Sequence, residues 1–260
     1  MQRLSIKDLS SGFGTLLKNK KIENLMIANN MGKFGLIEKK NKNQTNEEVL
    51  SQIKHFLPNA SIIVPTANLN LPNSEMTYDN KNTPSYKMGS FSEFIRKKNE
   101  SMRSFHPFWS LSVLGKNSNN LTSDISNHAY DKNSVFFRLF QNKKNYFLSL
   151  GQHPRFMLSI IHHIEHINKV PYRFEKSFSI LCRKNEKSDF KKKEFKLDVL
   201  KDEYRYKERT CNKFIFSNFE NKGDLKFIKI NNLNLYLFNI VEFYEITCAL
   251  FKKDIFCYWK

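Results

Sequence analysis

Four ionisable side chains lie within one short segment of the chain, residues 159–166, which reads Ser-Ile-Ile-His-His-Ile-Glu-His. Residues three or four apart share a helical face, so His162 can approach both Glu165 and His166. A histidine beside a carboxylate is a common proton acceptor near neutral pH. We therefore predict a helix that carries acid–base chemistry, with Ser159 one turn before His162.

The same segment also fits the pattern H-x-x-E-H, which binds zinc in other folds. In that alternative His162 and His166 are metal ligands and Glu165 activates a water molecule. A third ligand would come from an acidic residue further along the chain: Glu175, Asp189, Glu194 or Asp198. A histidine can also be buried for structure alone, which leaves a non-catalytic binding module as a third class.

The charge of the chain is strongly positive. Its 260 residues include 43 Lys and Arg against 25 Asp and Glu, which gives a formal net charge of +18. The simpler interpretation of this charge is a lysine-rich surface. The more specific interpretation is a partner or substrate that bears phosphate or carboxylate. Because no zinc finger, helix-turn-helix or RNP-like motif accompanies the charge, we predict no nucleic-acid partner.

Membrane and export signals are also missing from the residue pattern. No run of eighteen apolar residues occurs, which predicts no membrane span, and residues 1–20 lack the apolar core of a secretory signal. The cysteines are scattered without a C-x-x-C pair, which predicts neither a zinc ribbon nor a disulfide framework: they are Cys182, Cys211, Cys248 and Cys257. We therefore expect a reducing, cytoplasmic location.

Helical and strand patterns alternate along most of the chain. Amphipathic or capped stretches predict helices at residues 6–17, 47–56, 90–98, 134–140, 157–168 and 240–252. Short apolar runs predict strands at residues 22–28, 60–65, 109–114 and 146–150, and a later hairpin of residues 227–230 and 233–238. This alternation is typical of an α/β fold with a mixed, mainly parallel central sheet flanked by helices.

Two regions are less regular. Residues 68–87 have the composition of a loop. Between residues 172 and 206 short strands alternate with charged turns, and the lysine-rich residues 184–196 fit a solvated loop or hairpin. We predict a single domain over residues 1–260, with a subdomain shift near residue 171.

Two upstream motifs and the segment around His162 follow one another in a characteristic order. The first reads Thr83-Pro84-Ser85-x-x-Met88-Gly89, and the second reads Arg103-Ser104-x-His106-Pro107-x-x-Ser110. The third follows a strand ending in Leu150-Gly151 and extends from Ser159 to Pro171. Together they resemble the aminoglycoside 3-N-acetyltransferase family, also called the antibiotic N-acetyltransferase family. The resemblance is good over about residues 20–174 and looser beyond them, and it implies an antibiotic N-acetyltransferase-like fold.

The resemblance implies an acyltransferase that moves an acetyl group from acetyl-CoA to an amino group of a sugar. His162 matches the family's catalytic histidine, which takes a proton from the amine, and Glu165 matches the carboxylate that orients it. Ser159 stands where the family has threonine, and we expect its hydroxyl to stabilise the oxyanion of the tetrahedral intermediate. No cysteine or serine is placed as a covalent nucleophile, so we expect direct transfer in a ternary complex, without a metal.

Coenzyme A contacts follow from the same resemblance. A loop after the first strand is expected to offer backbone N–H groups to phosphates, through Asn29, Asn30, Met31, Gly32 and Lys33. The second motif is expected to line the pantetheine channel or to support its walls, through Arg103, Ser104 and His106. The loop departs from the family pattern, because Ala28, Asn29 and Asn30 replace the usual histidine and serines. Because backbone contacts do not depend on side-chain identity, we expect the loop still to bind CoA.

The net charge also bears on the acceptor. Aminoglycosides are polycations, and a chain of net charge +18 should repel them. We therefore predict an anionic or neutral amino-sugar acceptor, carried on a nucleotide diphosphate, on a lipid diphosphate or in an acidic polysaccharide, as in surface-polysaccharide or amino-sugar metabolism. Aminoglycoside acetylation in antibiotic resistance is the alternative, and an H-x-x-E-H zinc hydrolase is the remoter one. The sequence is compatible with a monomer or a homodimer.

Overall fold

The centre of the molecule is built from short apolar strands that are buried on both faces. The computed structural model describes residues 4–71, 77–207 and 212–260. Strand β1 (Asn24–Asn29) is buried at every position. It pairs in parallel with β2 (Ser61–Pro65) on one side and with β6 (Asn145–Leu150) on the other. A continuous apolar run is the pattern expected of a strand covered on both faces.

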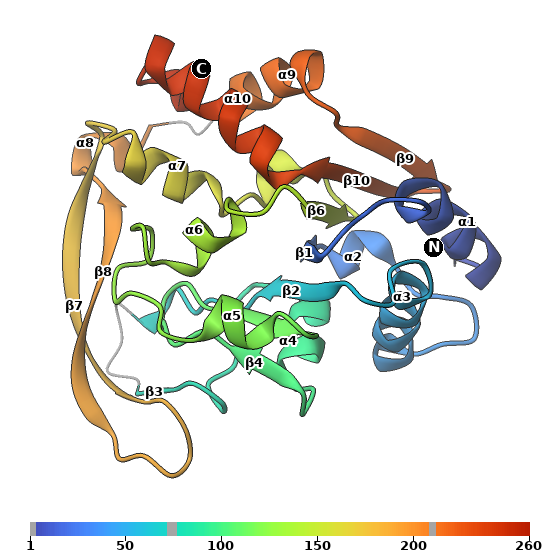
Figure 1. Cartoon of the computed structure of the whole chain (residues 1–260), viewed down its shortest axis with the longest axis horizontal. Helices are drawn as coiled ribbons and strands as arrows, with labels where there is room; N and C mark the ends of the chain where they lie inside the picture. The colour runs from blue at the N-terminus through green and yellow to red at the C-terminus, as the bar shows by residue number, and fades with distance from the viewer. Residues whose placement is uncertain (1–3, 72–76, 208–211) are drawn as a thin grey trace.

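Seven strands form the central sheet, in the order β4-β5-β2-β1-β6-β10-β9 (Figure 1). The outer strands are β4 (Ser101–Arg103), β5 (Leu111–Leu114), β9 (Lys226–Ile230) and β10 (Leu233–Asn239). The predicted mixed sheet is confirmed, as is the hairpin of β9 and β10. Parallel pairing is limited to β2, β1 and β6, and the outer pairs are antiparallel. The expected parallel majority is therefore corrected, because short connections without a crossover helix join β4 to β5 and β9 to β10.

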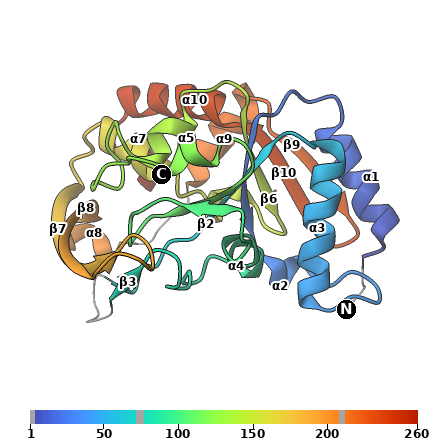
Figure 2. The same ribbon diagram turned by 60° about the horizontal axis from the view of Figure 1, so that its bottom comes forward.

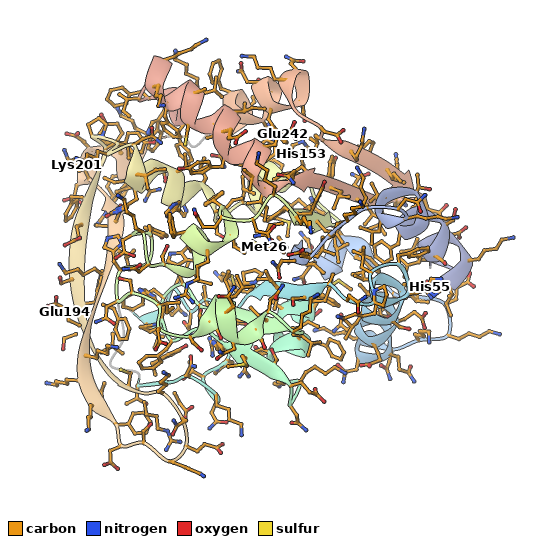
Figure 3. All side chains as sticks on the ribbon, in the orientation of Figure 1. Met26, His55, His153, Glu194, Lys201 and Glu242 are labelled. Carbon is orange, nitrogen blue, oxygen red and sulfur yellow. The ribbon has the colours of Figure 1, made fainter. Side chains whose placement is uncertain are left out.

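Alternate residues of β1 face two different helical layers. Leu25 and Ile27 belong to one apolar cluster, and Met26 and Ala28 belong to the other. The first cluster contains residues of α1 (Ile6–Leu17), α3 (Lys42–Phe56) and α4 (Ser90–Arg96). The second contains residues of α6 (Val135–Leu139), α7 (Ile161–Ile167), α9 (Lys213–Lys222) and α10 (Ile240–Lys253). Figure 2 shows the sheet between these layers, and Figure 3 shows Met26 at the centre of the molecule.

Shorter elements complete the chain. They are α2 (Met31–Phe34), α5 (Ser118–Thr122), α8 (Asp202–Arg205), and the 3-10 turns η2 (Pro154–Phe156) and η3 (Cys257–Trp259). The expected loop at residues 68–87 lies partly outside the described residues, and its later part includes the short strand β3 (Tyr78–Asp79).

Two helices begin several residues away from their predicted first residue. Helix α3 begins at Lys42 rather than at residue 47, because Asn41 and Gln44 form a capping box that satisfies the first backbone N–H groups. Helix α7 begins at Ile161 rather than at residue 157, because η2 and a turn occupy the preceding residues. Ser159 therefore lies in the turn that leads into α7.

The region after Pro171 forms two long strands rather than several short ones. Strands β7 (Arg173–Arg183) and β8 (Lys191–Leu200) pair antiparallel along their whole length, and β3 extends this second sheet. The prediction of short strands is wrong, because the charged residues counted as turns are exposed positions of these strands. The predicted hairpin in the lysine-rich segment is present. Figure 3 shows Glu194 and Lys201 at this outer edge of the molecule.

The two sheets share one apolar cluster. Ile180 and Phe195 of the second sheet pack in the same cluster as Met26 of the central sheet. Among the described residues, no helix is long and apolar enough to cross a membrane. The cysteines within that part of the chain, Cys182, Cys248 and Cys257, are free thiols, and Cys211 lies outside it.

Candidate active site

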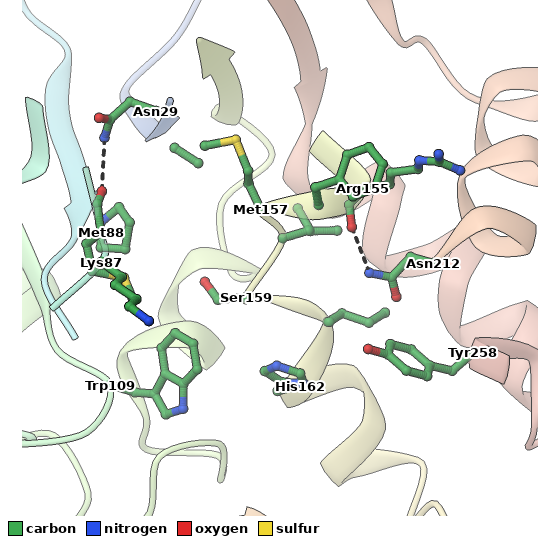
Figure 4. Close-up of a pocket in the computed structure, with 15 residues that line it drawn as sticks. Asn29, Lys87, Met88, Trp109, Arg155, Met157, Ser159, His162, Asn212 and Tyr258 are labelled. Carbon is green, nitrogen blue, oxygen red and sulfur yellow. Dashed lines mark hydrogen bonds between the residues drawn. The ribbon is translucent and has the colours of Figure 1, made fainter. Parts of the chain in front are cut away.

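A cavity of about 330 Å³ lies where the three parallel strands end. Ala28 and Asn29 at the end of β1 and Pro65 at the end of β2 form part of its wall. The segment after β6, residues 155–162, forms much of the rest. The carboxyl ends of parallel strands are the usual location of a ligand site in an open α/β sheet. We call this space the catalytic cavity (Figure 4).

His162 and Glu165 form a close pair on the wall of this cavity. His162 Nδ1 lies 2.7 Å from Glu165 Oε2. The two residues are three positions apart on α7, which brings their side chains to the same helical face as predicted. The imidazole lines the cavity, whereas the Glu165 side chain is 0 % exposed. A carboxylate in this position accepts the Nδ1 proton and fixes the ring, so proton exchange with a substrate would go through Nε2.

Glu165 has two further polar partners, one in an ion pair and one in a hydrogen bond. Arg173 Nε lies 2.9 Å from Oε2, and the Tyr172 hydroxyl donates to Oε1 at 3.0 Å. Burial alone would raise the pKa of Glu165, but the charge of Arg173 and the hydrogen bond from His162 outweigh it and hold that pKa below its usual value. Glu165 is therefore a carboxylate near neutral pH. Tyr172 and Arg173 follow Pro171 directly, and the sequence analysis missed both.

Aromatic rings flank His162. The rings of Trp109 and Tyr130 have centroids 5.8 Å and 5.7 Å from the His162 ring. Trp109 lines the catalytic cavity together with Ser159 and His162, and Figure 4 shows Tyr258 across from Trp109. Trp109 lies inside the second motif, so its place in the sequence could have identified it as a residue of the site. Tyr258 near the end of the chain had no comparable signal.

A second cavity of about 740 Å³ adjoins the first. The two share Asn29, Lys87 and Met157 as lining residues. The second is lined by four of the five residues predicted to contact coenzyme A: Asn29, Asn30, Met31 and Gly32. The fifth, Lys33, lines a neighbouring cavity together with Gly32. We call the second space the CoA cleft, after the expectation that coenzyme A binds there.

The Asn29 side chain ties β1 to α4. Its amide donates to Ser92 Oγ at 2.9 Å and to the Met88 carbonyl at 3.3 Å, and its oxygen accepts from the Phe91 N–H. Gly89 has φ 88°, and a Cβ added there would lie 2.2 Å from Asn29 Oδ1. The Met88-Gly89 pair of the first motif therefore permits a close approach between this loop and the end of β1.

Asn30 has its own local role. Its Oδ1 accepts the Lys33 N–H at 3.1 Å as the N-cap of α2, and its amide donates to Gln152 Oε1 at 2.6 Å. Because both asparagine side chains are engaged within the protein, contacts from this loop to a ligand fall mainly to backbone groups.

The residues of the second motif lie behind the wall of the catalytic cavity. The Arg103 guanidinium donates to the backbone oxygens of Thr66, Thr83 and Asn80. Ser104 accepts the Leu111 N–H at 2.9 Å, and His106 Nδ1 accepts the Trp109 N–H at 3.2 Å. Ser104 and His106 are almost fully buried, and burial lowers the pKa of His106 to about 3.

This arrangement places these three residues outside the lining of both cavities. It favours wall support over cofactor contact for Arg103, Ser104 and His106. His106 supports the site indirectly, because it holds the backbone of the cavity residue Trp109.

The zinc arrangement of H-x-x-E-H is not assembled. His166 Nδ1 lies 2.7 Å from Asp198 Oδ2, away from the carboxylate that holds His162. His166 and Asp198 do lie near His128, whose Nε2 is 3.5 Å from Asp198 Oδ1. However, His128 Nδ1 accepts the Tyr130 N–H at 3.0 Å, so a neutral His128 carries its proton on Nε2. A protonated nitrogen cannot bind a metal, and Nε2 lies 3.4 Å from Glu175 Oε2 and 3.5 Å from Asp198 Oδ1.

The chain matches known proteins both in sequence and in fold. The family model described as Aminoglycoside 3-N-acetyltransferase matches residues 38–252. The chain is also similar to solved structures. For the YokD protein from Bacillus subtilis, the TM-score is 0.75 at 18% identity, covering 98% of this chain and 96% of that chain. A comparison with curated protein sequences finds no match.

Two further structures have bound ligands. Sisomicin-bound AAC-VIa has a TM-score of 0.80 at 14% identity, covering 97% of this chain and 99% of that one. The binary complex of AAC-IIIb with CoASH has a TM-score of 0.78 at 15% identity, covering 97% of each chain. At these identities, structural similarity shows the shared fold, whereas the family match extends over most of the sequence. The chain therefore belongs to the aminoglycoside 3-N-acetyltransferase family, and it is an acyltransferase whose cosubstrate is acetyl-CoA.

Proposed function

We propose that the protein transfers the acetyl group of acetyl-CoA to an amino group of an amino sugar, with His162 as the general base and Glu165 as the carboxylate that orients it. The observation that carries this proposal is the 2.7 Å contact between His162 Nδ1 and Glu165 Oε2 on the wall of the catalytic cavity. The adjoining CoA cleft gives a cosubstrate access to the same histidine.

The reaction needs a base because an amine is largely protonated near neutral pH and attacks only as the free base. As the amine nitrogen bonds to the acetyl carbon, His162 takes the proton that the nitrogen loses. The carbon–sulfur bond then breaks, and the imidazolium returns this proton to the departing sulfur. Glu165 remains ionised throughout, because its ion pair with Arg173 holds its pKa below the usual value.

Ser159 is the proposed oxyanion donor. It lines the catalytic cavity in the turn before α7, on the same wall as His162 (Figure 4). A hydroxyl at this position can donate to the oxygen that becomes negative as the acetyl carbon turns tetrahedral.

Coenzyme A fits the second cavity by the chemistry of its lining. Leu36, Met31 and Met157 offer apolar contacts for a pantetheine arm, and the first turn of α2 presents backbone N–H groups that have no partner within the helix. Lys42 adds a positive charge that suits a phosphate. The lining shared with the catalytic cavity would bring the thioester toward His162.

The acceptor is proposed to be neutral or anionic. Among the described residues that line the catalytic cavity, none is Asp or Glu, whereas Lys87 and Arg155 are present. Figure 4 shows the Lys87 ammonium directed toward the cavity and the Arg155 guanidinium directed away from His162. A polycation would meet an uncompensated positive charge here. This supports an acceptor of surface-polysaccharide or amino-sugar metabolism, such as an amino sugar linked to a nucleotide diphosphate.

Aminoglycoside acetylation is the second candidate function. The observation in its favour is that AAC-VIa, which shares the fold over 97% of this chain, is seen with bound sisomicin. An aminoglycoside would then be held by groups outside the lining of the catalytic cavity.

An acceptor screen with detection of released thiol separates these candidates. The purified chain is incubated with acetyl-CoA and, in turn, a nucleotide-linked amino sugar, free glucosamine and sisomicin. Faster thiol release with the nucleotide-linked sugar supports the proposal, and release with sisomicin at an equal or higher rate establishes the aminoglycoside function. His162→Ala gives the uncatalysed background. His55→Ala, which removes an exposed histidine of α3, is the matched control and should retain full activity.

A further inference from the structure

We infer that Arg173 is a positioning residue that sets the pH range over which His162 and Glu165 work together. This inference rests on the proposed function. It starts from a contact that the predicted pair does not contain: Arg173 Nε and His162 Nδ1 lie 2.9 Å and 2.7 Å from the same oxygen, Glu165 Oε2. One carboxylate oxygen thus serves a permanent cation and an imidazole.

Arg173 and His162 also contact each other directly, and both of the nitrogens involved are donors. Arg173 Nη2 lies 3.2 Å from His162 Nδ1. If Nδ1 keeps the proton that it donates to Glu165, the guanidinium N–H finds no lone pair there. A second proton on the ring would then place two cations around one carboxylate. Arg173 therefore opposes protonation of His162, while Glu165 favours it.

The charges balance only when the imidazole is neutral. The Glu165 side chain is 0 % exposed and the Arg173 side chain is 10 % exposed, so their opposite charges cancel with little help from water. With Arg173 present and the imidazole of His162 neutral, the charges of Arg173 and Glu165 sum to zero. Without Arg173, the buried carboxylate would be unpaired, and the pair of His162 and Glu165 would retain a proton to higher pH. A general base that holds a proton cannot accept one.

Other polar groups near His162 do not replace this cation. Tyr130 and Tyr172 are buried, which raises the pKa of each hydroxyl, so both stay neutral through the working range. Tyr258 contributes another phenol from the C-terminal turn η3. Lys87 reaches the cavity from the loop before α4, and it is an exposed lysine. His166 faces Asp198.

The second sheet fixes the position of Arg173. It is the first residue of β7, and its Nη1 donates to the backbone oxygen of Asp198 on β8 at 3.3 Å. Pairing along the whole of β7 and β8 therefore holds the guanidinium against Glu165. The second sheet contributes no residue to the lining of the catalytic cavity. It contributes the positive charge of Arg173, which lies behind His162 and Glu165.

The test is the pH dependence of kcat/KM for thiol release in Arg173→Met, which removes the charge and keeps much of the side-chain volume. We expect the acid limb to move upward by about 1–2 pH units, the size of shift that one adjacent charge produces. Activity at pH 7 should then fall about tenfold or more and recover as the pH rises. Arg173→Lys should keep the midpoint closer to that of the wild type. The acceptor amine titrates equally in all variants.

Arg183 provides a matched control. It lies on the same strand and pairs with Asp79 through Nη2 at 2.6 Å, at the far end of the hairpin. Arg183→Met should lower stability without moving the midpoint. Tyr172→Phe, which removes a neutral donor to Glu165, should move it less than Arg173→Met does. Circular dichroism verifies that each variant is folded.

A second readout does not depend on acetyl transfer. The ring signals of His162, assigned by comparison with His162→Ala, are titrated by NMR in the wild type and in Arg173→Met. A higher midpoint in the variant supports the inference. An unchanged midpoint, or an activity loss that is equal at every pH, overturns it. A wild-type protein that releases no thiol with any acceptor would contradict the proposed function instead, and the NMR titration would still decide the role of Arg173.

Discussion

Helix α7 carries the histidines of two histidine–carboxylate pairs that are alike in geometry and different in surroundings. His162 Nδ1 lies 2.7 Å from Glu165, and His166 Nδ1 lies 2.7 Å from Asp198. Glu165 is fully buried and shared with Arg173, and its histidine lines the catalytic cavity. The Asp198 side chain is 10 % exposed and faces a second histidine, and its carboxylate has no salt bridge to an arginine side-chain nitrogen among the described residues.

We attribute the different proposed roles of the two histidines to the partner of each carboxylate. Asp198 raises the pKa of His166, which favours an imidazolium held in an ion pair. At the other pair, the positive charge of Arg173 offsets Glu165, so the same contact can orient a neutral imidazole. The first arrangement contributes to stability, whereas the second suits a base.

The largest expected contrast comes from removing each histidine. His162→Ala should lower kcat by about 10³-fold, because general base catalysis is lost. His166→Ala should leave kcat within about a few-fold of the wild type, because it lines neither the catalytic cavity nor the CoA cleft. Steady-state thiol release measures both. Equal losses in the two variants would contradict the distinction between the pairs.

Ser159 lines the catalytic cavity together with His162 of the first pair. Ser159→Ala should lower kcat by about 10²-fold if its hydroxyl stabilises the oxyanion. Ser159→Thr keeps the hydroxyl and should retain most of the activity. Single-turnover thiol release measures the chemical step directly. If alanine and threonine behave alike, Ser159 shapes the wall and does not donate.

The two carboxylates can be compared by amide substitution. Glu165→Gln should lower kcat by about 10–100-fold, as expected for the residue that orients a catalytic group. It should also lower the free energy of unfolding by about 3 kcal/mol, because Arg173 is left as a buried unpaired cation. Asp198→Asn should leave kcat nearly unchanged. Chemical denaturation with parallel kinetics separates the two effects, and a fully active Glu165→Gln would refute the orienting role.

The smallest expected effect is in the pH dependence of stability. The raised pKa of His166 gives a contribution that is complete below its unfolded value, about 6.5, and is lost as the pH rises through the folded value. The lowered pKa of Asp198 gives a contribution present above its unfolded value, about 3.9, and lost as the pH falls. The ion pair should therefore stabilise most between about pH 4 and 6.5.

His166→Gln tests this window. Between pH 6 and pH 9, the wild type should lose up to about 1 kcal/mol more unfolding free energy than the variant does. Urea denaturation at each pH gives the comparison. Parallel curves for the two proteins would show that the ion pair contributes nothing measurable.

Local patterns predicted much of the fold. The apolar runs of β1, β2 and β6 identified the buried core strands, because such runs are typical of a strand covered on both faces. The helix at Ile6–Leu17 and the hairpin of β9 and β10 were also correct. Where the prediction failed, distant pairing decided the outcome. The charged residues of β7 and β8 have the composition of turns, and only the pairing of the two strands with each other makes them strand positions.

The site divides in the same way. The amino-acid sequence by itself determined the contact of His162 with Glu165. Two side chains three positions apart on one helix lie on the same face, wherever that helix packs. The ordered motifs likewise identified the family. Only the tertiary structure decided that Arg173 stands behind Glu165, that Trp109 and Tyr258 enclose the cavity, and that His166 turns to Asp198. These contacts join separate elements, so their formation depends on how the two sheets and the C-terminal turn pack around α7.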